Sequence, residues 1–310
     1  MRLNECLVGD CREVLPTLEA GSVQTCVTSP PYWGLRNYNM DEQLGLEPTP
    51  EEYVENMVQV FREVKRVLRD DGTLWLNLGD SYAGSGKGQM GDGSASDRKG
   101  AKQGTSAGTL SGGLPIGNTG LASKQLVGIP WRVAFALQAD GWYLRQDIIW
   151  HKPNPMPESV TDRCTKAHEY IFLLSKSARY YFDAAAIAEE AQDWGTRDRS
   201  NGKYHNEGSG LTPHSGLEKS YETRNKRSVW TVTSKPFSGA HFATFPPDLI
   251  EPCILAGSKT GDTVLDPFGG SGTTGMVAES FGRNWVLIEL NPEYEKLSTY
   301  RTAQTGMKFV

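Results

Sequence analysis

The chain has 310 residues, enough for one large domain or for one domain with a smaller insert. The hydrophobic share of 38% is typical of a soluble globular protein, and the net charge of −5 argues against a protein that coats nucleic acid without specificity. No apolar run approaches the ~20 residues of a transmembrane helix, and the N-terminus lacks the features of a signal peptide, so no membrane association is expected.

The five cysteines are scattered and include no C-x-x-C pair. We therefore expect neither a metal site nor a disulfide framework, and a reducing cytoplasm is the simplest location.

The predicted elements alternate between strands and helices. Segment 7–10 ends a short strand, 11–19 favours a helix, and 22–29 favours a strand that stops at two prolines. The clearest helix spans 49–70, because its apolar residues recur at i, i+3, i+4 and i+7, and a buried strand is expected at 73–80. Later helices are expected at 131–139, 245–257, 271–282 and 292–302, and later strands at 143–152, 167–177, 179–183, 263–268 and 284–290. The consecutive strands after 143 suggest a hairpin, and therefore a mixed sheet.

Two segments differ in composition from the rest. Residues 84–124 are rich in Gly, Ser, Lys and Thr, which indicates a long loop inserted into the domain. Residues 184–235 are polar and irregular, and within 195–235 eight Lys and Arg stand against four Asp and Glu. We therefore expect a catalytic domain made of 1–183 and 236–310, with 184–235 as a separate recognition region.

The sharpest local pattern is the segment 266–275, DPFGGSGTTG, which follows an apolar strand and opens a helix. Glycines allow a tight turn close to a ligand, and Glu289, nineteen residues after Gly270, could accept hydrogen bonds from ribose hydroxyls. The spacing alone fits a nicotinamide or flavin cofactor, S-adenosylmethionine, or a structural turn. Two details favour the methyl donor: Asp266 could meet its ammonium group, and the turn lies late in the chain.

The second pattern is Ser29-Pro30-Pro31-Tyr32, followed by Trp33, at the end of a strand. The prolines fix the backbone and remove two donors, so the Pro30 carbonyl and the Ser29 hydroxyl are available as acceptors. Such a site could hold a planar base against an aromatic ring while its amino group donates to both oxygens. Taken alone, the segment is also compatible with an ordinary Pro-rich turn packed on the core.

Together, TSPPYW and the downstream DPFGGSGTTG resemble the β class of the amino-methyltransferases of DNA. The resemblance implies a Rossmann-like α/β fold with a seven-stranded, mostly parallel sheet, one antiparallel edge strand, and helices on both faces. It implies S-adenosylmethionine as cofactor and Ser29, Pro30, Pro31 and Tyr32 as catalytic residues. The residues that it places near the cofactor are Asp10, His241, Thr244, Phe245, Asp266, Phe268, Gly270, Ser271, Gly272, Thr273 and Glu289.

The substrate side follows from the same resemblance. A base in duplex DNA must be extruded before its amine can be methylated, so we expect a flipped base stacked on Tyr32 with Trp33 nearby. The basic region supplies the expected contacts to double-stranded DNA: Arg197, Arg199, Lys203, Arg224, Lys226 and Arg227. In this family, Ser at the first tetrapeptide position usually accompanies methylation of cytosine N4 and Asp that of adenine N6, so Ser29 favours cytosine.

Several alternatives remain. Adenine N6 methylation is the first, a nicotinamide- or flavin-dependent oxidoreductase the second, and a DNA-binding module with a decayed cofactor site the third. A cognate restriction endonuclease is a possible partner, and the sequence is compatible with a monomer or a homodimer.

Overall fold

The structure is a computed structural model that describes residues 2–35, 38, 40, 42–84, 119–191, 222–234 and 245–306. Within these residues, eight strands form one sheet in the order β1-β10-β9-β2-β3-β5-β4-β8, and β6 and β7 form a small separate pair. The strands are β1 (Glu5–Val8), β2 (Val23–Thr28), β3 (Leu68–Leu78), β4 (Tyr143–His151), β5 (His168–Ser175), β6 (Glu189–Glu190), β7 (Thr223–Arg224), β8 (Val229–Thr231), β9 (Thr263–Asp266) and β10 (Asn284–Glu289).

All strand pairs of the large sheet are parallel except those that β5 makes with β3 and β4. The expected mixed sheet and the β4–β5 hairpin are therefore confirmed. Two details differ from the expectation: the sheet has eight strands rather than seven, and the reversed strand lies inside the sheet rather than at its edge. The eighth strand arises because β8 pairs with β4, and the reversed strand is internal because β5 lies between β3 and β4.

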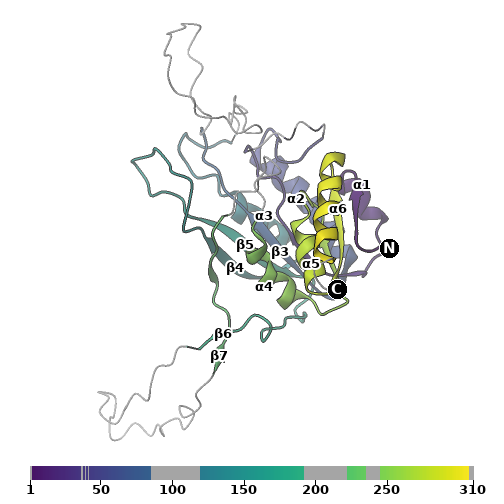
Figure 1. Cartoon of the computed structure of the whole chain (residues 1–310). Helices are drawn as coiled ribbons and strands as arrows, with labels where there is room; N and C mark the ends of the chain where they lie inside the picture. Colours follow the sequence, from purple (N-terminus) through teal and green to yellow (C-terminus); the bar gives the residue numbers. More distant parts are fainter. Residues whose placement is uncertain are drawn as a thin grey trace, which may run out of the picture.

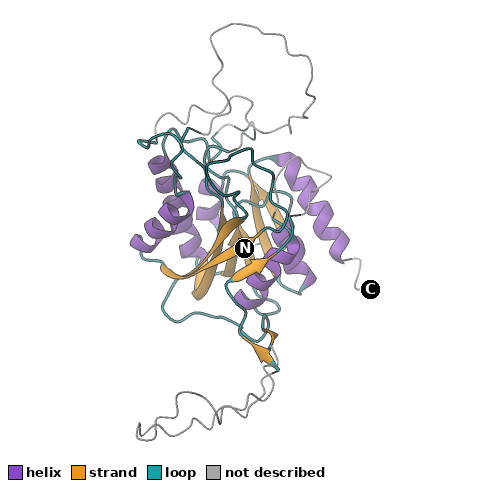
Figure 2. Cartoon of the chain, turned by 90° about the vertical axis from the view of Figure 1, so that its left-hand side faces the viewer, coloured by secondary structure: helices purple, strands orange, loops and turns teal. Residues whose placement is uncertain are grey.

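Helices cover both faces of the sheet (Figures 1 and 2). The first layer consists of α1 (Cys11–Val14), which continues into a 3-10 turn at Leu15–Thr17, α2 (Pro50–Val67) and α3 (Ile129–Ala139). The second layer consists of α4 (Pro247–Gly257), α5 (Thr273–Ser280) and α6 (Pro292–Gly306). The helices of the described part are too short or too polar to cross a membrane.

Helix α2 shows how the sequence sets an element. Thr49 caps it by accepting a hydrogen bond from the Glu52 N–H at 3.2 Å, and Pro50 occupies the first turn, where no N–H is needed. Its apolar stripe, which includes Tyr53, Met57 and Phe61, is fully buried against the core. The helix ends at Val67 and β3 starts at Leu68, which is earlier than the sequence predicts.

Two other boundaries differ from the expectation. Residues 179–183 form no strand, although the Tyr181 N–H donates to the Asp71 carbonyl at 2.9 Å. Strand β8 comes from the expected recognition region, and its Trp230 is 6% exposed within the core. Part of 184–235 therefore belongs to the large sheet.

The sheet order brings distant segments to one edge. β2 and β9 are neighbours, with Cys26 opposite Leu265, and β10 lies between β9 and β1, with Glu289 opposite Val8. Because these strands are parallel, the loops that follow Val8, Thr28, Asp266 and Glu289 all leave the sheet at its carboxyl end.

Candidate active site

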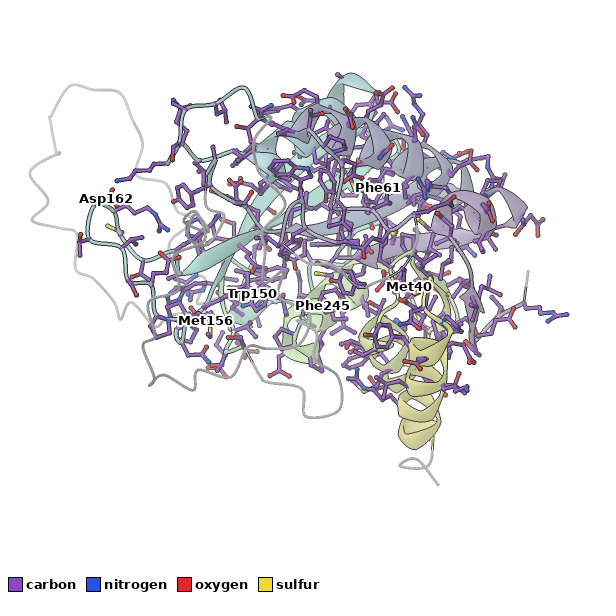
Figure 3. The ribbon with its side chains drawn as sticks, turned by 90° about the horizontal axis from the view of Figure 1, so that it is seen from above. Met40, Phe61, Trp150, Met156, Asp162 and Phe245 are labelled. Atoms are coloured by element: carbon purple, nitrogen blue, oxygen red, sulfur yellow. The ribbon has the colours of Figure 1, made fainter. Side chains whose placement is uncertain are left out.

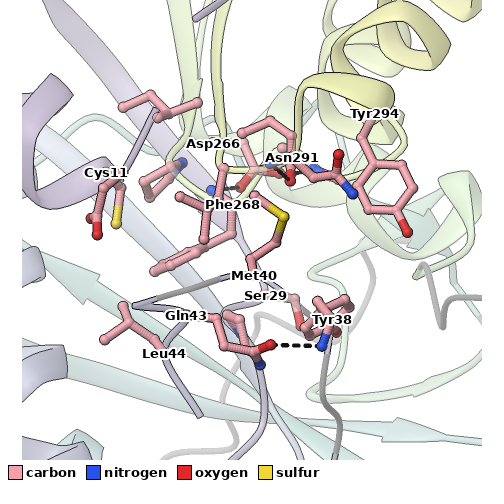
Figure 4. A pocket seen from close by; sticks show the side chains of 18 of the residues that line it. Cys11, Ser29, Tyr38, Met40, Gln43, Leu44, Asp266, Phe268, Asn291 and Tyr294 are labelled. Carbon is pink, nitrogen blue, oxygen red and sulfur yellow. Dashed lines mark hydrogen bonds between the residues drawn. The ribbon is translucent and has the colours of Figure 1, made fainter. Parts of the chain in front are cut away.

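A cavity opens at this carboxyl end, and Figure 4 shows many of the side chains that line it. Its walls come from the loops after β1, β2, β9 and β10, together with Phe245 before α4. Of the residues expected from the sequence, those that line it are Asp10, Ser29, Pro31, Phe245, Asp266, Phe268, Gly270, Ser271, Thr273 and Glu289. Ser29 and Pro31 of the tetrapeptide therefore face the same space as the glycine turn, whereas Pro30 and Tyr32 do not line it.

Asp266 joins the two segments directly. Its carboxylate accepts hydrogen bonds from the Thr28 hydroxyl at 2.6 Å, the Thr274 hydroxyl at 2.7 Å and the Phe268 N–H at 3.0 Å. Thr28 is the last residue of β2, immediately before Ser29. Burial raises the pKa of Asp266 to about 6, even though these three bonds favour the charged form.

The glycine turn is shaped by backbone conformation. Gly270 and Gly272 have φ angles of +50° and +78°, in the left-handed region that favours glycine. A Cβ atom at Gly272 would lie 2.5 Å from Cβ of Ser298, so α6 approaches the turn too closely for any side chain there. Gly272 does not line the cavity directly, but its conformation sets the start of α5.

Glu289 holds the turn against the end of β10. One carboxylate oxygen accepts from the Gly270 N–H at 2.8 Å, and the other accepts from the Asn291 N–H at 2.9 Å. Burial raises the pKa of Glu289. An ionised carboxylate has about four acceptor sites, so Glu289 can still accept from a ligand in the cavity.

Asp10 follows β1, the strand next to β10, and caps α1. It accepts from the Arg12 N–H at 2.8 Å and forms a bidentate ion pair with the Arg12 guanidinium. Burial works to raise the pKa of Asp10, but the Arg12 bonds outweigh it and hold the pKa below its ordinary value. Asp10 therefore stays charged at neutral pH.

The tetrapeptide is held from outside the cavity. Pro30 is buried, and the Pro31 carbonyl accepts from the Tyr53 hydroxyl at 2.9 Å. Among the described residues, no hydrogen bond occupies the Pro30 carbonyl. The Tyr32 hydroxyl lies behind the cavity wall, 2.9 Å from Oδ1 of Asn77 and 2.8 Å from Oε2 of Glu169.

Trp33 requires a correction. Its side chain is 4% exposed, belongs to the hydrophobic core, and donates its indole N–H to the Glu47 carbonyl at 2.9 Å. The ring therefore supports the loop after β2 and offers no face to a base.

Three of the residues expected to contact DNA lie in the described part of the chain. Arg224, Lys226 and Arg227 surround Glu189 beside the β6–β7 pair, which lies at the end of the sheet opposite the cavity (Figure 1). This position separates them from Ser29. The other expected DNA residues and two cofactor residues lie outside the described part of the chain: Arg197, Arg199, Lys203, His241 and Thr244.

Sequence reasoning missed several residues of the site. The loop after β2 contributes Tyr38, Met40 and Gln43 to the cavity, and the start of α6 contributes Asn291 and Tyr294. Their position in the sequence could have indicated them, because they follow the tetrapeptide and the strand that ends at Glu289.

The mixed sheet, its two helical layers and the cavity beside the glycine turn define a Rossmann-like α/β protein of the methyltransferase kind. A family model described as DNA methylase matches residues 23–300. The chain therefore belongs to this family of DNA methylases, and its resemblance to the amino-methyltransferases of DNA is confirmed.

Individual relatives agree with this family assignment. The chain is 48% identical over 293 residues to the Type II methyltransferase M.Cfr9I of Citrobacter freundii, a match that covers 94% of this chain and 85% of the relative. A cytosine-N4-specific PvuII DNA methyltransferase has the same fold, with a TM-score of 0.63 and 21% identity over 96% of this chain and 85% of that one. A Thermus thermophilus protein described as a putative DNA modification methylase, solved with S-adenosyl-L-methionine, has a TM-score of 0.58 and 25% identity over 97% and 93% of the two chains.

Proposed function

We propose that this chain transfers a methyl group from S-adenosylmethionine to the exocyclic amino group of a flipped base in DNA, with cytosine N4 favoured and adenine N6 as the alternative. One observation carries the proposal. Ser29 and the glycine turn line a single cavity, and the Thr28–Asp266 hydrogen bond of 2.6 Å fixes one against the other.

The residues of the cavity fit the cofactor. Glu289 keeps acceptor sites for the ribose hydroxyls, and Phe268 supplies an apolar ring beside them. Asp266, bonded to Thr28 next to Ser29, and Phe245 also line the cavity, and the methionine end would lie near them. When bound, S-adenosylmethionine supplies an electrophilic methyl group.

The chain's own residues would then position the amine. The Ser29 hydroxyl oxygen and the Pro30 carbonyl would accept hydrogen bonds from the two N–H groups of the amine. These bonds orient the nitrogen and increase its electron density. No strongly basic group is required, because the nitrogen loses its proton only after the methyl arrives. The choice of cytosine rests on Ser29 rather than Asp at this position.

Loop 152–167 connects β4 and β5 at the end of the sheet where the cavity lies, and it offers a surface for DNA. Met156 on this loop is 83% exposed, which is unusual for a large apolar side chain, and Pro153, Pro155 and Pro157 restrict the backbone around it. Asn154 ties the loop to Ser234 by three hydrogen bonds of 3.1–3.2 Å. In the view from above, Phe245 lies between Met156 and Met40 of the cavity (Figure 3). Met156 is suited to fill the gap that a flipped base leaves in the stack.

A direct test is to incubate the protein with duplex DNA and radiolabelled S-adenosylmethionine and to digest the DNA to nucleosides. The proposal predicts label in N4-methylcytosine and none with Ser29→Ala. Label in N6-methyladenine would reverse the choice of base, and transfer that does not depend on Ser29 would contradict the proposed site.

The oxidoreductase alternative is tested by calorimetry. S-adenosylmethionine should bind and NAD should not, whereas the reverse would overturn the cofactor assignment. The cognate endonuclease, the oligomeric state and the recognition role of 184–235 remain predictions.

A further inference from the structure

The Tyr32 phenol lies at the centre of a polar chain that begins at the candidate catalytic serine. Its oxygen is 3.4 Å from Oγ of Ser29, 2.9 Å from Oδ1 of Asn77 and 2.8 Å from Oε2 of Glu169. Beyond Tyr32, the second carboxylate oxygen of Glu169 pairs with Lys152. A phenol carries a single proton, so it can donate to one neighbour only.

The neighbours determine the direction of these bonds. The Asn77 amide donates its N–H to the Tyr170 carbonyl at 3.0 Å, so its oxygen faces Tyr32 as an acceptor. Glu169, paired with a cation, is also an acceptor. Tyr32 must therefore give its proton to one of these two groups, which leaves its own lone pair to accept from Ser29.

This direction matters for the reaction. A serine hydroxyl can donate or accept, but to draw on an amine it must accept. With its proton directed at Tyr32, the Ser29 oxygen presents lone pairs to the cavity, where the amine would be held.

We propose that Glu169, held by Lys152, is a positioning residue that acts through Tyr32 to orient the Ser29 hydroxyl and is the final acceptor of the proton released by the methylated amine. This inference rests on the proposed function. In the proton step, the amine N–H bond breaks as a Ser29 O–H bond forms, and the original Ser29 proton passes to Tyr32. The original Tyr32 proton passes to Glu169, so Ser29 and Tyr32 each lose one O–H bond as they gain another.

The surroundings support this route. Burial raises the pKa of Tyr32 well above its ordinary value and the Glu169 charge raises it further, so Tyr32 passes a proton on rather than losing one to solvent. The side chains of Glu169 and Lys152 are 18% and 20% exposed, so water can remove the proton. The other titratable groups facing Glu169 are Lys166 and His168, whose pKa values are both lowered, first by burial.

The test measures single-turnover methyl transfer at saturating cofactor and DNA. Glu169→Gln should slow it about a hundredfold at pH 8 and leave the affinities for both ligands unchanged. Glu169→Asp should restore part of the rate, because it keeps a carboxylate that can accept the proton from Tyr32.

Two further variants complete the test. Tyr32→Phe keeps the ring and removes the hydroxyl, so it should slow transfer as much as Glu169→Gln, and the double variant should be no slower than either single one. Glu63→Gln breaks the ion pair with Arg66 on α2, away from the cavity, and should leave the rate unchanged.

Additive losses, or no recovery of the rate with Glu169→Asp, would overturn the relay. A wild-type protein that methylates no DNA would instead overturn the proposed function.

Discussion

Asp266 is a buried carboxylate whose environment opposes its charge. Burial raises its pKa from 3.8 to about 6, so the folded chain holds this proton at pH values where the unfolded chain has released it. Its contribution to stability is therefore fully present below pH 4 and is lost as the pH rises through 6. The total effect is about 3 kcal/mol.

Replacement of Asp266 by Asn should remove this loss. In urea unfolding between pH 4 and pH 7, wild-type stability should fall relative to Asp266→Asn by about 3 kcal/mol. Parallel pH curves for the two proteins would contradict the assignment. Asp266→Ala is a poor test of catalysis, because it leaves the hydroxyls of Thr28 and Thr274 without their acceptor.

Two glycines allow the cost of a strained backbone to be measured apart from the cost of a steric clash. Gly272 and Gly261 both have positive φ angles, +78° and +85°, but a Cβ at Gly261 would have no atom within 4 Å. Gly261→Ala should therefore cost only the ~1–2 kcal/mol of a left-handed residue. Gly272→Ala adds the clash with Ser298 and should cost ~1–3 kcal/mol more. Equal melting temperatures for the two variants would show that α6 does not constrain the turn.

The sequence predicted the residues whose positions follow from a nearby sequence pattern. It did not predict the residues whose positions depend on contacts with distant parts of the chain. The positions of Asp266 and Glu289 in the cavity followed from the spacing of a turn and the strand after it. The burial of Trp33 depends on α2 and on the Glu47 carbonyl, neither of which the tetrapeptide reveals. Glu169 lies at the start of the reversed strand, so its proximity to Tyr32 depends on the strand order.

At the scale of elements, the long periodic segments were predictable and the short ones were not. Helix α2 has a clear apolar stripe, and the β4–β5 hairpin follows from two consecutive strand patterns. Strand β8 has only three residues and exists because it pairs with the exposed edge of β4. A segment that short has no recognisable alternation, so the expected sheet lacked its eighth strand.

The loop that carries Met156 gives a prediction at this scale. Met156→Ala should slow methylation of fully paired DNA about tenfold, because the vacated position in the stack is no longer filled and extrusion costs more. Methylation of DNA with a mismatched target base should change far less, since that base is already unpaired. Met156→Leu should retain most of the activity. Equal losses on both DNA substrates would show that Met156 has no role in flipping.

At the scale of the whole molecule, the sheet order creates the site. The tetrapeptide follows β2 and the cofactor turn follows β9, yet the two strands are neighbours, and Thr28 reaches Asp266 across 238 positions of the chain. Separate sequence patterns predicted each half of the site. Their meeting required the fold, which the family resemblance supplied and the strand register confirms.

Methyl transfer in this cavity must leave its product in DNA. Mass spectrometry of nucleosides from the DNA of cells that express the chain or its Ser29→Ala variant detects that product. We expect N4-methylcytosine with the wild-type chain and none with the variant. DNA without any methylated amino group in the wild-type cells, or equal methylation in both, would show that this cavity does not methylate an amine of DNA.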